Sequence, residues 1–175
     1  MADDNPPLVQ STKAQPEGAE KELPLYYQSG SCFHNAYINK NYHYKDRNLK
    51  LVIGSLSFNG WTEYGGKNWK LADFIKNSPG GRSWDAHAWL EDEDGFIYDK
   101  VFSSYNTVAK KRTGEELNEE LLEGNGLLVE ADPDWVEEAG LTYTPADKET
   151  QKHILAALMP HLKETERIYK LQNGL

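Results

Sequence analysis

The chain has 175 residues, a single cysteine and a formal net charge of −9 at pH 7, with a mean hydropathy of −0.75 and a pI near 5.0. This length suits one domain with a hydrophobic core. The acidic balance argues against a nucleic-acid binder, which needs a basic face, and against adhesion to an anionic membrane. No apolar run approaches the roughly 18 residues that span a bilayer. One cysteine excludes an internal disulfide framework and suits a reducing compartment, and no secretory signal is recognisable, so we expect a cytoplasmic protein.

Composition divides the chain into a tail and a folded part. Residues 1–22 are rich in Pro, Gln, Glu and Lys and contain little to bury, which predicts a disordered tail. We expect residues 23–175 to form one domain. Its candidate chemistry lies in a core of about 27–102, and a mainly helical part follows at about 112–172.

The negative charge is concentrated late in the chain. Twelve acidic and only two basic residues lie between Arg112 and Thr150. One interpretation of residues 115–149 is a set of solvated helix faces. The other is a surface that attracts a basic partner.

The first half of the folded part alternates between helical and extended patterns. A short helix is predicted from Cys32 to about Asn39, a polar and aromatic loop at 39–48, and a β-rich strand at 49–58. A Gly-rich loop with large aromatic residues follows at 59–66. Apolar spacing at 69–77 then predicts another short helix, which the sequence Ser-Pro-Gly-Gly would end.

The second half adds a hairpin and the C-terminal helices. In chain order we expect strands at 83–90 and 96–102, a helix at 114–123, a short strand at 127–130, a helical turn after Asp132, and a last helix at 147–171. Pro160 should kink or split that last helix. Helices segregated from a mostly antiparallel sheet make an α+β fold, with the cysteine-bearing helix packed on the sheet.

The hairpin places a histidine and a carboxylate on neighbouring strands. If its loop is centred on Glu93, His87 and Asp99 lie directly opposite each other, about 5 Å apart at Cβ and on one face. A tight turn at Asp94-Gly95 would instead leave Asp99 across from Leu90. Contact between His87 and Asp99 therefore depends on the register.

Cys32, His87 and Asp99 suit thiol-based catalysis. A free thiol has a pKa of about 8.5, so it needs a helix N-terminus or an adjacent imidazole to become a thiolate near neutral pH. The imidazole in turn needs a third group to orient it, here Asp99. Backbone N–H groups at the helix start would bind the oxyanion of an acyl intermediate. Gln28 and Ser31, just before the cysteine, are further candidates for oxyanion or substrate binding.

These motifs resemble a known family. Gly30-Ser31-Cys32 with Ala36, followed by His87-Ala88-Trp89-Leu90-Glu91, Asp94-Gly95 and Asp99, is similar to the core of the transglutaminase-like branch of the papain-like fold. The resemblance covers roughly residues 27–102 and implies Cys32 as nucleophile, His87 as general base and acid, and Asp99 as orienting group. Asp92 and Asp94 remain alternative carboxylates. Similar motif pairs occur in small phage and viral proteins of uncertain role.

The resemblance implies acyl transfer, most simply hydrolysis of a peptide, isopeptide or glutamine amide bond, with a protein or peptide substrate and no cofactor. The rival interpretation is a catalytically inactive interaction module. In that case an aromatic groove would bind a peptide or glycan, and the same side chains would line the substrate cleft of an enzyme: Trp61, Tyr64, Trp84 and Trp89. No metal is expected, because the histidines lack metal-ligand spacing.

Overall fold

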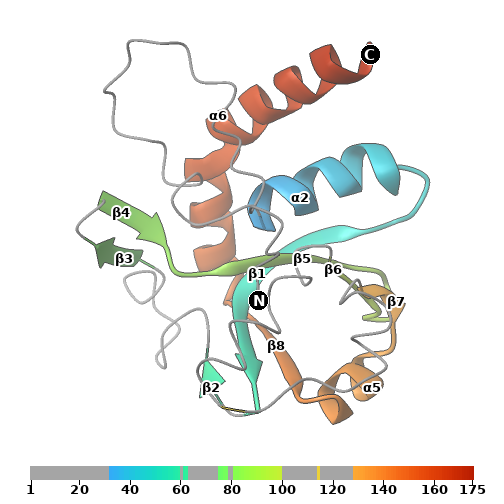
Figure 1. Cartoon of the computed structure of the whole chain (residues 1–175), viewed down its shortest axis with the longest axis vertical. Coiled ribbons are helices and arrows are strands. Elements are labelled where there is room, and N and C mark those ends of the chain that lie inside the picture. The colour runs from blue at the N-terminus through green and yellow to red at the C-terminus, as the bar shows by residue number, and fades with distance from the viewer. Residues whose placement is uncertain (1–31, 60, 63–74, 79–80, 100–113, 115–127) are drawn as a thin grey trace, which may run out of the picture.

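The computed structural model describes residues 32–59, 61–62, 75–78, 81–99, 114 and 128–175. Their helices and strands form the expected α+β arrangement, an antiparallel curled sheet with a long C-terminal helix (Figure 1). The predicted tail and nearly all of the helix predicted at 114–123 lie outside the described residues. None of the helices in the described part is long and apolar enough to cross a membrane.

The main sheet has six strands in the order β2-β1-β5-β6-β7, with β8 paired to β1. Its strands are β1 (Lys50–Phe58), β2 (Trp61–Thr62), β5 (His87–Glu91), β6 (Ile97–Asp99), β7 (Leu128–Ala131) and β8 (Leu141–Pro145). All pairings are antiparallel. A separate two-stranded sheet joins β3 (Ile75–Ser78) to β4 (Gly81–Trp84).

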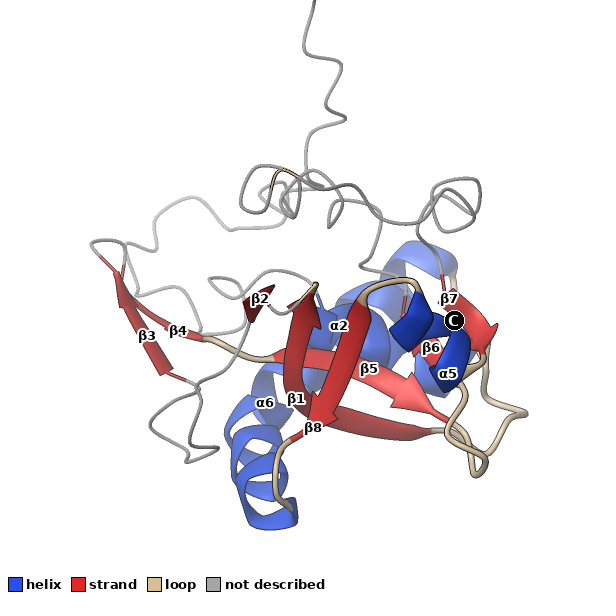
Figure 2. Ribbon diagram, turned by 90° about the horizontal axis from the view of Figure 1, so that it is seen from below, coloured by secondary structure: helices blue, strands red, loops and turns tan. Residues whose placement is uncertain are grey.

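The long strand β1 carries the curl of the sheet. Its first half pairs with β5 and its second half with β8 (Figure 2). Gly54 lies where the two halves meet and pairs with both His87 and Pro145. A Cβ at this position would lie 2.1 Å from the carbonyl oxygen of Thr144. Glycine is therefore required here, because β8 crosses too close for any side chain.

Four helical segments accompany the sheet in the described part of the chain. They are α2 (Cys32–Ile38), the π-helical turn η2 (Asn39–His43), α5 (Pro133–Glu138) and α6 (Lys148–Asn173). Figure 1 shows α2 and α6 on one side of the sheet and α5 on the other. The start of α5 follows from its sequence, because Asp132 accepts a hydrogen bond from the Asp134 N–H and Pro133 occupies the first turn.

Each side of the sheet has its own core. Buried residues facing α2 and α6, here called the helix-side cluster, are Cys32, Phe33, Ala36, Leu49, Ile53, Ala86, Ala88, Leu90, Tyr98, Ala146, Ile154, Leu158 and Leu162. Those facing α5, the α5-side cluster, are Val52, Leu56, Phe58, Trp89, Ile97, Leu128, Ala131, Val136, Ala139 and Leu141. Alternation along β5 separates the two, since Ala88 and Leu90 point to one side and Trp89 to the other.

Three predicted elements are wrong in part. The loop expected at 39–48 begins as η2, where the Tyr44 N–H reaches back to the Asn39 carbonyl. Residues 75–77 of the helix expected at 69–77 form strand β3, which pairs antiparallel with β4 from Ile75 with Trp84 to Ser78 with Gly81. The strand expected at 83–90 is two strands, β4 and β5, which belong to different sheets.

Pro160 lies inside a continuous α6 and does not split it. Figure 1 shows a bend part-way along this helix, as expected from the clash of a proline ring with the carbonyl one turn earlier. Its buried residues recur at helical spacing up to Thr165.

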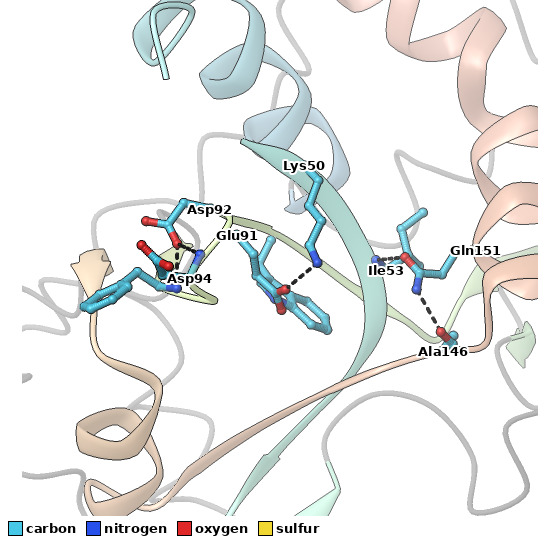
Figure 3. Close-up of polar contacts among 9 residues, drawn as sticks. Lys50, Ile53, Glu91, Asp92, Asp94, Ala146 and Gln151 are labelled. Carbon is cyan, nitrogen blue, oxygen red and sulfur yellow. Dashed lines mark hydrogen bonds and ion pairs between the residues drawn. The ribbon is translucent and has the colours of Figure 1, made fainter. Parts of the chain in front are cut away.

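The side chain of Gln151 continues the pairing of β1 and β8 beyond their last strand pair. Its Oε1 accepts from the Ile53 N–H at 3.0 Å, and its Nε2 donates to the Ala146 carbonyl at 2.7 Å (Figure 3). One turn of α6 is thus fixed to the place where β8 leaves the sheet.

Candidate functional site

Cys32 is the first residue of α2, and that helix packs against β5. Its side chain is buried, with 3% of the residue exposed, and Sγ lies 3.9 Å from the carbonyl oxygen of Ala86. Ala86 directly precedes β5, so the thiol lies at the N-terminal end of this strand. Packing in the helix-side cluster holds it there, through Phe33 and Ala36 on the same helix.

His87, the first residue of β5, contacts Asp99 on β6. The Nε2–Oδ2 distance is 2.5 Å, and the side chains are only 4% and 1% exposed. The predicted partnership of this histidine and this carboxylate is therefore present in the structure. A charged or strongly polar pair buried to this degree requires mutual hydrogen bonding to be tolerated.

The hairpin register differs from both predicted registers. The described pairs of the hairpin are Leu90 with Tyr98 and Glu91 with Ile97. This pairing is centred on Asp94, and one further step places Asp99 across from Trp89. His87 and Asp99 are thus diagonal rather than directly opposite, a separation that longer side chains still span on a shared face. The prediction that the contact needs a loop centred on Glu93 is wrong, because a shift by two residues preserves the face.

The alternative carboxylate Asp92 serves the turn instead. Its Oδ1 accepts from the backbone N–H groups of Asp94 at 3.0 Å and Phe96 at 2.9 Å (Figure 3). Gly95 adopts a positive φ of 85°, as expected for the last residue of a three-residue hairpin loop. Asp94 is exposed. Asp99 is therefore the carboxylate that this hairpin brings to His87.

The surroundings of His87 favour its protonated form. Burial alone would lower the pKa of the imidazole, but the charge of Asp99 and their hydrogen bond oppose this effect. The neighbouring Cys32 also raises the pKa of His87. Together these interactions raise the pKa of His87 to about 10, so the imidazole is an imidazolium at neutral pH.

Tyr143 also belongs to the site and was not predicted from the sequence. This residue of β8 donates its hydroxyl to Asp99 Oδ2 at 2.8 Å, the same oxygen that contacts His87. Its ring lies 6.0 Å from that of His87 and 5.1 Å from that of Trp89, between centroids. The signal was the alternation in Leu-Thr-Tyr-Thr between Gly140 and Pro145, which is typical of a short strand.

Trp89, which was predicted to line an aromatic groove, is fully buried. Its ring is nearly parallel to that of His87, 6.1 Å away between centroids. Its Nε1 donates to Glu91 Oε1 at 2.8 Å, and Glu91 also pairs with Lys50 at 3.3 Å (Figure 3). The motif His-Ala-Trp-x-Glu thus places three interacting side chains on one face of β5.

The side chains of the other predicted site residues lie outside the described part of the structure. Gln28, Ser31 and Tyr64 lie outside the described residues, and only the backbone of Trp61 in β2 and Trp84 in β4 is described. Within the described ranges, no group of three or more His, Cys, Asp or Glu side chains is arranged to hold a metal ion.

Comparison with known proteins returned no match. No family model fits the sequence, and neither a curated protein nor a solved structure is significantly similar to the chain. The chemistry of the site therefore has to be argued from its own geometry.

Proposed function

We propose that the protein is a thiol-dependent acyl-transfer enzyme, most simply one that hydrolyses an amide bond of a protein or peptide. The observation that carries the proposal is the buried His87–Asp99 pair beside the only cysteine of the chain. An imidazolium next to a thiol favours the thiolate, which is the nucleophilic form. A papain-like or transglutaminase-like origin of this arrangement is part of the proposal.

The proposed reaction has two stages. Cys32 Sγ attacks the substrate carbonyl carbon, and the imidazolium gives its proton to the leaving nitrogen as the carbon–nitrogen bond breaks. Because Asp99 engages Nε2, Nδ1 is the ring nitrogen that would exchange this proton. In the second stage His87 takes a proton from water, the resulting hydroxide attacks the thioester, and the carbon–sulfur bond breaks to release the acid and restore the cysteine. An amine in place of water would give transfer instead of hydrolysis.

The first test measures the reactivity of the thiol. The chain contains one cysteine, so alkylation by iodoacetamide reports on Cys32 alone. We expect the folded protein to react at pH 6 at least about tenfold faster than a cysteine peptide. His87→Gln should abolish the excess, and His43→Ala, which replaces an exposed histidine on η2, should keep it. An inert thiol in the folded wild-type protein would contradict the proposal.

The second test measures acyl transfer itself. With p-nitrophenyl acetate, the wild-type protein should release p-nitrophenol and gain one acetyl group at Cys32, visible by mass spectrometry. The acetyl group should then be lost to water. Cys32→Ser should lose the thioester while retaining the fold, as judged by circular dichroism. Alkylation without acetylation would indicate a reactive thiol that is not an acyl-transfer nucleophile.

A further inference from the structure

We propose that Tyr143 is a positioning residue of the thiol site, which holds Asp99 and shares its negative charge with His87. The catalytic part of this inference rests on the proposed function. The effect of Tyr143 on the His87–Asp99 pair can be tested independently. The hydroxyl of Tyr143 and Nε2 of His87 contact the same oxygen, Oδ2, at 2.8 and 2.5 Å.

Strand topology makes this contact a link across the curled sheet. Asp99 ends β6, whereas Tyr143 lies on β8, and the two strands are separated in the sheet by β5 and β1. Curling brings their side chains together on the α5 side, where the Tyr143 ring packs edge-on against Trp89. The carboxylate is thus held from two directions, by its neighbour β5 and by the distant strand β8.

A second donor on one carboxylate oxygen has a definite electrostatic consequence. When His87 is neutral, the buried negative charge of Asp99 depends on the Tyr143 hydroxyl for compensation. When His87 is protonated, the imidazolium supplies most of that compensation. Removing the hydroxyl therefore penalises the neutral imidazole more than the imidazolium. The hydroxyl limits how tightly Asp99 retains the proton that His87 must release and take up during the reaction.

Among the described residues, the titratable groups around this centre come from four elements. Asp99 on β6 and Cys32 on α2 both act on the imidazole of His87, which belongs to β5, and Tyr143 on β8 acts through Asp99. A change at position 143 should therefore appear in the titration of His87. It should vanish when the carboxylate is replaced, as with Asp99→Asn.

The experiment compares Tyr143→Phe with wild type and with a matched control. Tyr42→Phe also removes a tyrosine-to-carboxylate hydrogen bond, from Tyr42 to Glu166 at 2.5 Å, but on the α6 surface. The pKa of His87 is read from its ring nitrogen signals by NMR. Tyr143→Phe should raise the pKa of His87 by about half a pKa unit or more. The free energy of such a shift is roughly a third of that of a hydrogen bond to a charged group. Tyr42→Phe should leave the pKa of His87 unchanged.

The same shift should appear in the chemistry. Hydrolysis of the acetylated Cys32 needs neutral His87, so its pH–rate profile in Tyr143→Phe should move to higher pH by the amount seen by NMR. The phenylalanine ring preserves the packing, which a thermal unfolding curve verifies. In the Asp99→Asn background, Tyr143→Phe should cause no further change in either readout.

Each outcome decides one of the two proposals. If the wild-type protein is not acetylated, the acyl-transfer function fails, and the NMR titration still decides the role of Tyr143. If the wild-type protein is acetylated and Tyr143→Phe leaves the His87 titration unchanged or moves it to lower pH, the role of Tyr143 is overturned and the function stands.

Discussion

The single buried imidazolium makes His87 the residue whose protonation should couple most strongly to folding. In the unfolded chain the pKa of a histidine is about 6.5, whereas burial opposed by Asp99 and Cys32 leaves the pKa of His87 at about 10 in the fold. The stabilisation that the fold gains from protonated His87 is therefore fully present below about pH 6.5 and is lost as pH rises through 10. Between these values the folded protein holds a proton that the unfolded chain has released.

We accordingly predict that in Cys32→Ser, where no thiol can release a proton as His87 takes one up, the free energy of unfolding falls as pH rises above 6.5. The slope contributed by His87 is at most about 1.4 kcal/mol per pH unit, because one proton is involved. Urea denaturation at several pH values measures this slope. Adding His87→Gln to Cys32→Ser should lower the stability at pH 6.5 and flatten the pH dependence above it. An equal slope in the two proteins would mean that His87 is not protonated in the fold.

At the residue scale, the sequence identified the two groups whose chemistry is local. His87 and Asp99 were found because a hairpin brings neighbouring strands together. Side chains alternate between the two faces of a strand, so a register shift of two residues leaves both side chains on the same face. Tyr143 was not found, because its contact with Asp99 depends on the curl of the whole sheet.

The crossing of β1 and β8 is the element-scale feature that most constrains the site. Gly54 pairs with His87 on one strand and Pro145 on the other. A methyl group there would meet two backbone atoms of β8 and the backbone nitrogen of Ala146 at less than 3 Å, and backbone cannot rotate away as a side chain can. Any side chain at position 54 must push β8 outward, and with it Tyr143.

We predict that Gly54→Ala destabilises the protein by more than about 3 kcal/mol, which is large for a single methyl group. Gly95→Ala is the matched control, because it has open space around the added methyl but a positive φ of 85°. Its cost should be about 1–2 kcal/mol, from backbone conformation alone. Chemical denaturation of both variants gives the comparison. Equal costs would show that β8 does not approach β1 as closely as described.

Sequence patterns predicted the two longest described elements well. The strand at 49–58 and the helix at 147–171 were found nearly to their observed ends, β1 and α6. Sequence patterns failed where a short apolar run is compatible with both a helix and a strand. The run before Ser78 has helical spacing, yet its last residues pair with β4, and pairing partners are not visible in local periodicity.

At the scale of the whole molecule, the candidate site bridges two cores. Cys32 belongs to the helix-side cluster, whereas Trp89 and the ring of Tyr143 pack in the α5-side cluster. His87 begins the strand that divides them. The geometry of the site therefore requires both cores to form together, so the two halves should unfold as one cooperative unit.

Leu158 tests this coupling from the side of the sheet opposite Trp89. It is fully buried on α6, whereas Leu171 on the same helix is 69% exposed. Leu158→Ala should cost about 2–5 kcal/mol through lost burial and the cavity left behind. Leu171→Ala should change stability by less than about 0.5 kcal/mol.

Urea denaturation followed by two probes distinguishes one unit from two. Circular dichroism at the helix band reports mainly on the helices, and tryptophan fluorescence includes Trp89 and Trp135 on the α5 side. If the cores are coupled, Leu158→Ala shifts both transitions to lower urea by the same amount, although both tryptophans pack in the α5-side cluster. Separate midpoints in the variant would show that the α5-side core folds without α6. The His87–Asp99 pair would then persist in a chain whose thiol is no longer held beside it.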